Sequence, residues 1–272
     1  MTSVQPPFAL CARTLRRIIL NQSKRANVGH IGSSLSVVDI ISVLYGSILN
    51  ITDPADHERD RFVLSKGHAA LALYAAFHMK DWLADGQLDT FCGSNTLLGV
   101  HPEHALKGVD FSSGSLGMGL GFAAGAALAA RMEGSSRRAF ALLSDAECNE
   151  GSVWEAAMFA AHHRLANLTA IIDLNGQQAL GHTIDVLNQD RMAERWEAFG
   201  WEVHTVDGHD QAALHAVLCR LNNHQGPPHL ILARTTFGKG VSFMENTIKW
   251  HYWPMNQEEY QQAMAEVEGG PL

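Results

Sequence analysis

Ala139-Phe-Ala-Leu-Leu-Ser-Asp-Ala-Glu-Cys-Asn-Glu-Gly-Ser-Val-Trp-Glu-Ala156, followed by Leu168-Thr-Ala-Ile-Ile-Asp-Leu-Asn-Gly176, is the stretch that decides the fold. Its two apolar runs predict buried strands, and the residues between them predict a helix. Asp145 ends the first strand and Asn175 the second, 175 − 145 = 30 positions later. In such a β-α-β unit, both strands end on one edge of a parallel sheet, where open α/β folds bind ligands.

The end of each strand carries a side-chain oxygen that can bind a metal ion. Asp145 offers a carboxylate and Asn175 an amide oxygen. Mg²⁺ prefers oxygen ligands, takes few of them from protein and completes its octahedron with water and phosphate oxygens. Aspartate is also a good helix N-cap, but the second ligand at Asn175 favours the metal site. The pair therefore predicts a diphosphate-bearing cofactor that is held through its metal.

Strands and helices alternate along the whole chain. Strands are expected at 61–64, 138–144, 168–174, 202–206 and 229–235, and helices at 8–26, 36–49, 69–79, 117–132, 152–164, 190–198, 210–223 and 256–267. This alternation predicts an α/β fold, a doubly wound and mostly parallel sheet flanked by helices. The Gly-His-Ile-Gly-Ser-Ser stretch at 29–34 is expected to be a loop. Because no repeat or linker interrupts the pattern, we expect one domain over residues 1–272.

The composition indicates an ordinary globular protein. Of 272 residues, 46% are hydrophobic and 18% charged, and the net charge is −8. No dense basic cluster is present, so no nucleic-acid partner is expected. The longest apolar run, 117–130, is too short to span a bilayer, and no signal peptide is evident, so no membrane partner is expected. Four cysteines without CxxC spacing indicate free thiols in the cytoplasm.

Further motifs resemble one known family. The segment from Asp145 to Asn175 resembles the thiamin-diphosphate motif, Gly-Asp-Gly followed by Asn. The chain is similar, over about residues 10–265, to the N-terminal part of transketolase. The motifs that carry the resemblance occur in order: Val28-Gly-His-Ile-Gly-Ser33, Asp60-Arg-Phe-Val-Leu-Ser-Lys-Gly-His68, His101-Pro-Glu103, Gly114-Ser-Leu-Gly-Met-Gly-Leu-Gly121, and Lys239-Gly-Val-Ser-Phe-Met-Glu-Asn-Thr-Ile-Lys-Trp-His251.

The resemblance implies thiamin diphosphate as the cofactor, with Mg²⁺ or another divalent cation. It makes Asp145, Asn175 and the main-chain oxygen of Gln177 the metal ligands. The cofactor-binding residues that it implies are His68, Gly114, Ser115, Leu116, Asp145, Ala146, Glu150, Asn175 and His251. It further implies that Gly114, Leu116 and Gly117 form the loop beside the aminopyrimidine ring.

Four histidines carry over as catalytic residues, namely His30, His68, His101 and His251. The resemblance places them above the reactive carbon of the cofactor, where they contact sugar hydroxyls and the diphosphate. Neutral imidazoles can donate and accept protons near pH 7, which suits this task.

This sequence departs from the family at two places. Ser144-Asp145-Ala146 replaces Gly-Asp-Gly, and the alanine methyl is tolerable unless φ is positive there. Tyr252 and Trp253 follow His251, where the family usually has a small residue. These two aromatics either reshape the substrate channel or belong to an interface.

Three other charged residues have two interpretations each. Glu150 and Glu155 match glutamates that link two active sites across a subunit interface in the family. They are also acids that any helix N-terminus favours. Lys239 is either a phosphate contact or an ordinary loop lysine.

The glutamate that activates thiamin diphosphate lies on a second, pyrimidine-binding domain in transketolases, and we expect that domain on a separate chain. The resemblance therefore implies the N-terminal subunit of a two-chain transketolase. A C-terminal subunit would complete it, as α₂β₂, and move a two-carbon ketol unit from a ketose phosphate to an aldose. The alternatives are a subunit like 1-deoxyxylulose-5-phosphate synthase or a 2-oxo acid dehydrogenase E1, or a non-catalytic cofactor-binding partner. The sugar could belong to the pentose phosphate pathway or to a dedicated catabolic route.

Overall fold

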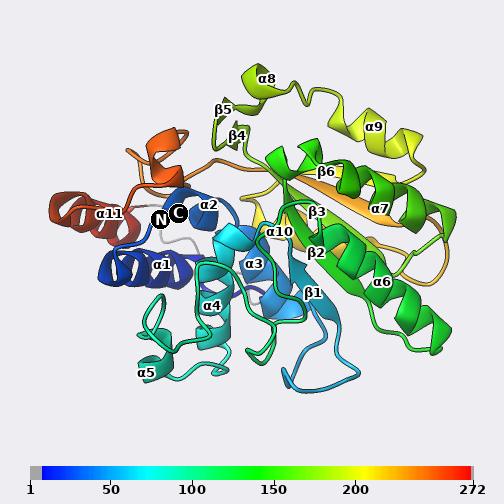
Figure 1. The fold of residues 1–272 in the computed structure, drawn as a ribbon, viewed down its shortest axis with the longest axis horizontal. Coiled ribbons are helices and arrows are strands. Elements are labelled where there is room, and N and C mark those ends of the chain that lie inside the picture. The colour runs from blue at the N-terminus through cyan, green and yellow to red at the C-terminus, as the bar shows by residue number, and fades with distance from the viewer. Residues whose placement is uncertain (1–7, 271–272) are drawn as a thin grey trace.

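A single parallel sheet organises the protein. The computed structural model describes residues 8–270, and within them five strands form this sheet in the order β1-β2-β3-β7-β6, with every neighbouring pair parallel (Figure 1). The strands are β1 (Arg61–Leu64), β2 (Ala139–Ser144), β3 (Leu168–Leu174), β6 (Glu202–Asp207) and β7 (His229–Arg234). The predicted α/β fold with a mostly parallel, doubly wound sheet is confirmed.

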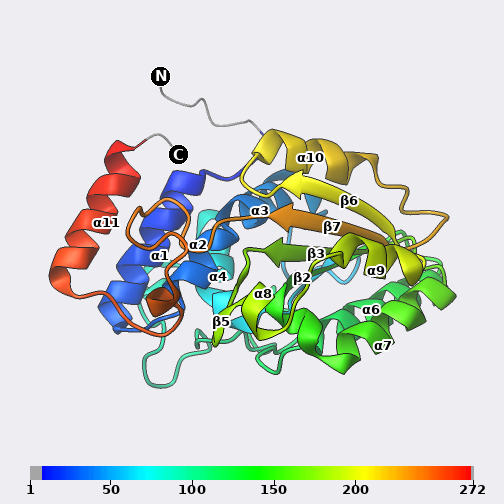
Figure 2. The same ribbon diagram turned by 90° about the horizontal axis from the view of Figure 1, so that it is seen from above.

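Helices cover both faces of the sheet (Figure 2). One face packs against α6 (Gly119–Met132), α7 (Gly151–His162) and α9 (Met192–Ala198), and the core on the other face includes α3 (Val38–Val43), α4 (Ala70–Met79) and α10 (Gln211–Arg220). Helix α1 (Ala12–Ala26) packs on α3 and α4. Strand β2 divides its side chains between the two cores: Phe140 and Leu142 enter one, and Ala141 and Leu143 the other. Strands β2, β3 and β7 are almost wholly buried and mostly apolar, whereas the edge strand β6 is partly exposed and carries several polar residues.

The last helix, α11 (Gln257–Gly269), packs beside α1. It begins with a capping box, in which the Asn256 side chain accepts from the Glu259 amide and the Glu259 carboxylate accepts from the Asn256 amide. None of the helices within residues 8–270 is long and apolar enough to cross a membrane.

The expected loop at 29–34 is wrong, because helix α2 (Ile31–Ser36) occupies most of it. All six helical residues are buried, and tertiary packing overrides the weak helix propensity of glycine. Gly32 lies so close to Phe237 that a β-carbon there would come within 2.1 Å of the ring. The expected helix at 36–49 is instead α3 followed by a π-helical turn at Leu44–Ile48.

The sequence analysis did not predict several short elements. A hairpin of β4 (Gln177–Gln178) and β5 (Gly181–His182) follows Asn175 directly, and α8 (Thr183–Val186) follows the hairpin. Helix α5 (Asp85–Leu88) lies between the expected helices at 69–79 and 117–132. Elements this short have too few residues for a periodic hydrophobic pattern to identify them.

Candidate functional site

The turn after β3 meets the turn after β2. The Asp145 carboxylate accepts hydrogen bonds from the amides of Ala146 and Gly176, both at 2.7 Å. The Asn175 amide oxygen accepts from the Gln177 amide at 2.9 Å. Residues 145 and 175–177 therefore form one compact group, as the 30-residue spacing predicts for adjacent parallel strands.

Asp145 is fully buried, and this burial has an electrostatic consequence. Burial raises the pKa of Asp145 to about 7, and the nearby Asp173 carboxylate adds to the rise. Among the described residues, no lysine or arginine forms an ion pair with Asp145. A buried carboxylate without a bonded cation, next to amide and carbonyl oxygens, is the donor set of a hard divalent ion.

Ala146 fits the turn without strain. It begins the 3₁₀ turn Ala146–Asn149, and it is not among the residues of positive φ. Alanine would be costly at this position only with a positive φ, so the replacement of glycine by Ala146 is tolerated.

Three histidine rings form a triangle near this edge. The ring centroids of His30 and His68 lie 5.5 Å apart, those of His30 and His251 5.4 Å, and those of His68 and His251 5.6 Å. The left-handed backbone of His30, at φ 59°, and the bond from its amide to the His251 carbonyl hold two of them in place. His101 lies near this group, because it interacts electrostatically with both His30 and His68.

All four imidazoles are held in the neutral form. Burial lowers the pKa of His30, His68 and His101, and it lowers the pKa of His251 to about 4. The Nδ1 atoms of His30 and His251 are buried and have no hydrogen-bond partner among the described residues. Buried polar atoms without partners are costly, so these two nitrogens indicate a place for a ligand.

The loop at 114–117 lies against this group. Gly114 has a φ of 152°, and a β-carbon there would come within 3.3 Å of the His101 ring. Ser115 is exposed and Leu116 half-buried, so both face out of the core. Gly117 has a φ of 86° and donates its amide to the Glu147 carboxylate at 2.7 Å.

Glu147 is a buried residue of the site that the sequence analysis missed. Besides the Gly117 amide, its carboxylate accepts from the Ser65 hydroxyl and the Ser144 amide. Burial raises the pKa of Glu147, and these hydrogen bonds oppose the rise. Glu147 thereby ties the ends of β1 and β2 to the glycine loop.

A second missed element is the buried ion pair of Lys66 and Asp173. Neither side chain is exposed to solvent. The Asp173 carboxylate also accepts from the Ser36 hydroxyl at 2.7 Å, from the Thr235 hydroxyl, and from the Asn175 amide at 2.8 Å. Burial opposes the charge on Asp173, but Lys66 and these bonds outweigh it and lower the pKa. A lone aspartate inside the apolar run of β3 was the available hint.

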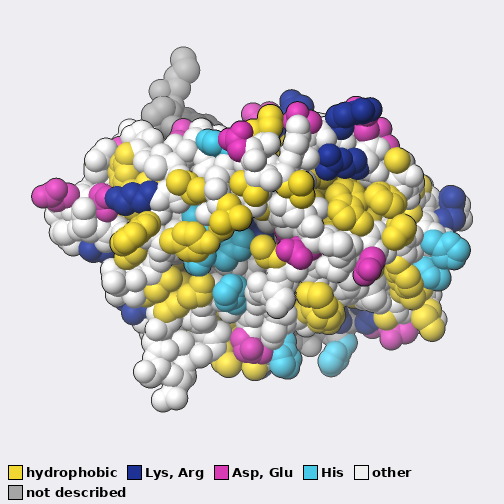
Figure 3. Space-filling view, turned by 45° about the horizontal axis from the view of Figure 1, so that its top comes forward, with side chains coloured by type: hydrophobic (Ala, Val, Ile, Leu, Met, Phe, Trp, Pro, Cys, Tyr) yellow, Lys and Arg dark blue, Asp and Glu magenta, His cyan; other side chains and the backbone are white. Residues whose placement is uncertain are grey.

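The remaining candidate site residues are mostly exposed. Glu150 is the N-cap residue of α7 and is exposed, as is Glu155. The ammonium of Lys239 lies 3.6 Å from the Glu245 carboxylate. Tyr252 is exposed but packs on His251, with ring centroids 4.7 Å apart, whereas Trp253 is 64% exposed. Figure 3 shows histidine side chains near the middle of one face, with hydrophobic side chains around them.

The fold and the site together define an α/β domain that binds a cofactor at the carboxyl edge of its sheet. Residues 9–268 match the family described as transketolase, thiamine diphosphate binding domain. The chain belongs to the transketolase family, and the predicted identity as an N-terminal transketolase section is confirmed.

Two relatives of similar length are named as transketolase subunits. The chain is 37% identical over 245 residues to an apulose-4-phosphate transketolase subunit of Phocaeicola vulgatus, covering 89% of this chain and 87% of that protein. It is also 37% identical over 260 residues to the 6-deoxy-6-sulfo-D-fructose transketolase subunit SqwG of a Clostridium species, covering 94% of each.

Solved transketolases share the fold but are longer. The transketolase of Campylobacter jejuni superposes with a TM-score of 0.88 at 32% identity, covering 96% of this chain and 42% of that chain. The transketolase of Leishmania mexicana superposes with a TM-score of 0.87 at 28% identity, covering 96% and 41%. The chain therefore spans about two-fifths of these structures.

Proposed function

We propose that this chain, over residues 1–272, is the diphosphate-binding subunit of a two-chain transketolase. The assembled enzyme would transfer a two-carbon ketol unit from a ketose phosphate to an aldose. The observation that carries the proposal is the arrangement of a metal-ligand turn at Asp145 and Asn175 beside neutral imidazoles at one edge of the sheet.

Asp145, Asn175 and the Gln177 main-chain oxygen would hold Mg²⁺, which would supply positive charge for the diphosphate. The cofactor would also contact His68, His251, Ala146, Glu150 and the loop Gly114-Ser115-Leu116. Bound thiamin diphosphate supplies the nucleophilic carbon and the electron sink that ketol transfer needs. The raised pKa of Asp145 supports the metal, because a cation there compensates the buried charge.

His30, His68, His101 and His251 would bind the sugar hydroxyls and carry protons. Because their pKa values are lowered, these imidazoles are neutral at pH 7 and can accept a proton at one nitrogen while donating from the other. The buried Nδ1 atoms of His30 and His251 have no hydrogen-bond partner among the described residues, so they could bond a substrate hydroxyl.

A partner subunit with the pyrimidine-binding domain would complete the site, as α₂β₂. Large apolar side chains are exposed on α6, α7 and the segment after β4, and these support a protein interface. They are Met118, Phe122, Met158, Phe159, Leu180, Ile184 and Leu187. Two relatives are named as subunits, which supports the existence of a partner subunit. Glu150 and Glu155 would face this interface.

The substrate would be an unusual sugar phosphate. The Tyr252 ring lies 6.0 Å from the His30 ring and 4.7 Å from the His251 ring, so it narrows the approach to both. The relatives named for apulose 4-phosphate and 6-deoxy-6-sulfo-D-fructose support a dedicated catabolic route over the pentose phosphate pathway. The four free thiols support a cytoplasmic location.

Co-expression with the product of the adjacent reading frame tests this proposal. Ketol transfer is measured with xylulose 5-phosphate, fructose 6-phosphate and their specialised analogues, with and without thiamin diphosphate and Mg²⁺. The proposal expects activity that needs both chains and the cofactor. Pyruvate decarboxylation by the complex would favour the other thiamin enzymes, and a complex that binds no cofactor would favour a non-catalytic partner.

A further inference from the structure

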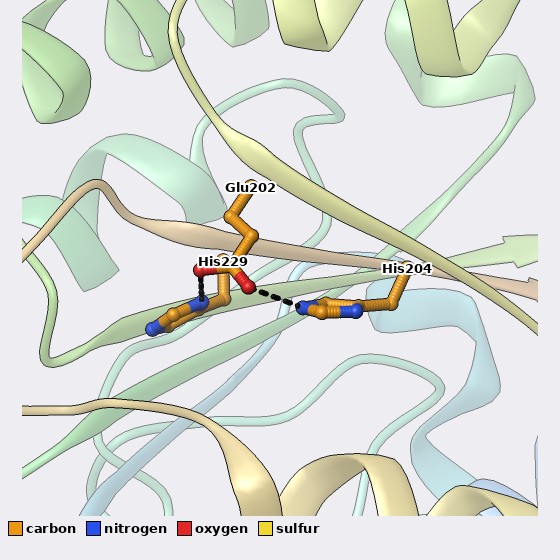
Figure 4. A group of neighbouring side chains, drawn as sticks. All are labelled: Glu202, His204 and His229. Atoms are coloured by element: carbon orange, nitrogen blue, oxygen red, sulfur yellow. Dashed lines mark ion pairs between the residues drawn. The ribbon is translucent and has the colours of Figure 1, made fainter.

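Three potential metal ligands meet at the edge of the sheet that lies opposite the cofactor site (Figure 4). Glu202 begins β6 and pairs with His229, which begins β7. His204 lies two residues after Glu202, so both point to the same face of β6. The strand β7 has six residues and separates this cluster from the carboxyl edge by about 20 Å.

His229 has a fixed tautomer and an unused lone pair. Its Nε2 lies 3.0 Å from the Asn222 carbonyl, which can only accept, so Nε2 carries the proton. The Nδ1 atom of the neutral ring then presents a lone pair. This atom is buried, the residue is only 1% exposed, and Nδ1 has no hydrogen-bond partner among the described residues. A carbonyl that orients a histidine in this way is typical of metal sites.

The Glu202 carboxylate straddles the two rings, as Figure 4 shows. One oxygen lies 3.3 Å from His229 Nδ1 and the other 3.3 Å from His204 Nε2, which is likewise buried and without a hydrogen bond. A lone pair that faces an anionic oxygen is repelled, so a neutral His229 needs a cation between the two atoms. No lysine or arginine among residues 8–270 forms an ion pair with Glu202.

The separations fit a bound transition metal. Zinc bonds of about 2.0–2.1 Å at tetrahedral angles place neighbouring ligand atoms about 3.3 Å apart. The ligand atoms of the three residues all lie within 4.8 Å of one another. A small rotation of the half-buried His204 ring would bring all three within bonding distance of one ion. Two imidazoles and one carboxylate select Zn²⁺ or a similar metal over Mg²⁺.

We propose that Glu202, His204 and His229 bind one Zn²⁺ or similar divalent transition metal. Glu202 is half-exposed, so the ion enters from solvent, and water takes the fourth position. The site joins the edge strand β6 to β7 and to the chain at Asn222. It is independent of the cofactor site, and a metal there would stabilise this end of the sheet by binding only the folded chain.

Metal titration of the full-length, tag-free chain tests the proposal. The chain is stripped with a chelator, and Zn²⁺ and Co²⁺ are then titrated in excess Mg²⁺, which occupies oxygen-only sites. Elemental analysis gives the stoichiometry, and the Co²⁺ absorption spectrum reports nitrogen ligation. We expect one metal per chain, a tetrahedral Co²⁺ spectrum, and a higher thermal unfolding midpoint with Zn²⁺.

His204→Ala and Glu202→Ala are the test variants, because these side chains are not fully buried and their loss spares the core. Substituting a residue that merely orients a ligand costs about 10- to 100-fold in metal affinity, so losing a ligand should cost at least that. His224→Ala, at an exposed histidine of the neighbouring loop, is the matched control. The Cys219 thiol lies 3.5 Å from His215, and these two side chains could bind a transition metal elsewhere on the chain. Cys219→Ser is therefore a second control.

The proposal expects the two control variants to bind metal like the wild-type chain. It is overturned if His204→Ala and Glu202→Ala bind metal as tightly as the wild-type chain does. It is also overturned if Cys219→Ser abolishes metal binding, or if the wild-type chain takes up no stoichiometric metal. In that last case the cluster is an ion pair only.

Discussion

Asn175 donates its side-chain amide to the Asp173 carboxylate at 2.8 Å, and this bond decides which way the amide oxygen points. Asp173 can only accept while it is ionised, so the amide nitrogen faces it and the oxygen turns toward the Gln177 amide. The buried pair of Lys66 and Asp173 therefore orients a residue that we propose as a metal ligand.

Asp173→Asn should destabilise the chain strongly. The substitution leaves the buried Lys66 ammonium without its counter-charge, and breaking a buried pair from one side costs about 3–5 kcal/mol of unfolding free energy. Urea unfolding measures the loss. Glu194→Gln is the control, because Glu194 pairs with Arg191 on the surface, and it should leave the free energy unchanged within error. An equal effect of both substitutions would refute the structural importance of the buried pair.

The cofactor-free chain should lose stability through Asp145 as pH rises. The pKa of Asp145 in the folded chain, about 7, lies above the ordinary aspartate pKa of 3.8 that applies when the chain is unfolded. The folded chain thus holds the proton more tightly, so this contribution to stability is present below about pH 4 and is lost as pH rises to about 7. Urea unfolding of the wild type and of Asp145→Asn, at about pH 5 and about pH 8, measures the contribution of Asp145 to the free energy of unfolding. A difference between the two proteins that does not change with pH would contradict the assignment.

Gly32→Ala should destabilise the chain and disturb the histidines. A β-carbon would come within 2.1 Å of the Phe237 ring, which stacks on His251 with centroids 6.0 Å apart. Overpacking of this kind costs about 1–3 kcal/mol of unfolding free energy. Gly125→Ala is the matched control, because nothing lies within 4 Å of its added methyl. This helical position should gain about 0.5–1 kcal/mol. Thermal unfolding compares the two variants, and an equal response would argue against close packing at Gly32.

His251→Ala should reduce ketol transfer by the two-chain complex while leaving the fold intact. A positioned imidazole that moves protons contributes about 10²- to 10⁴-fold to rate, and His251 lies at the centre of the proposed substrate approach. Steady-state kinetics measure kcat/KM, and circular dichroism checks folding. His57→Ala, at an exposed histidine, should be neutral. Full activity of His251→Ala would remove this residue from the catalytic set.

Much of the sheet could be predicted, because β1, β2, β3 and β7 are largely buried and therefore contain apolar runs. The bounds 61–64 and 168–174 agree with β1 and β3. The spacing of Asp145 and Asn175 likewise placed these residues together, because parallel topology leaves few alternatives.

The features that could not be predicted from the sequence depend on tertiary contacts. Helix α2 forms because Gly32 packs under Phe237, a residue 205 positions later (237 − 32 = 205), and no local pattern encodes that contact. Glu147 resembles any acid near a helix start, and only the fold brings Ser65 and Gly117 to its carboxylate. The ligand cluster of Glu202, His204 and His229 also needs the strand pairing to form.

The central claim is that the turn at Asp145 and Asn175 binds thiamin diphosphate through a divalent metal. Equilibrium titration of the cofactor into the complex with its partner subunit tests it most directly. The titration is repeated with Mg²⁺, with a chelator, and with Asn175→Ala. Our account predicts tight binding with Mg²⁺, and a loss of at least tenfold, about 1.4 kcal/mol, both with the chelator and in the variant. Equal cofactor affinity under all three conditions would contradict it.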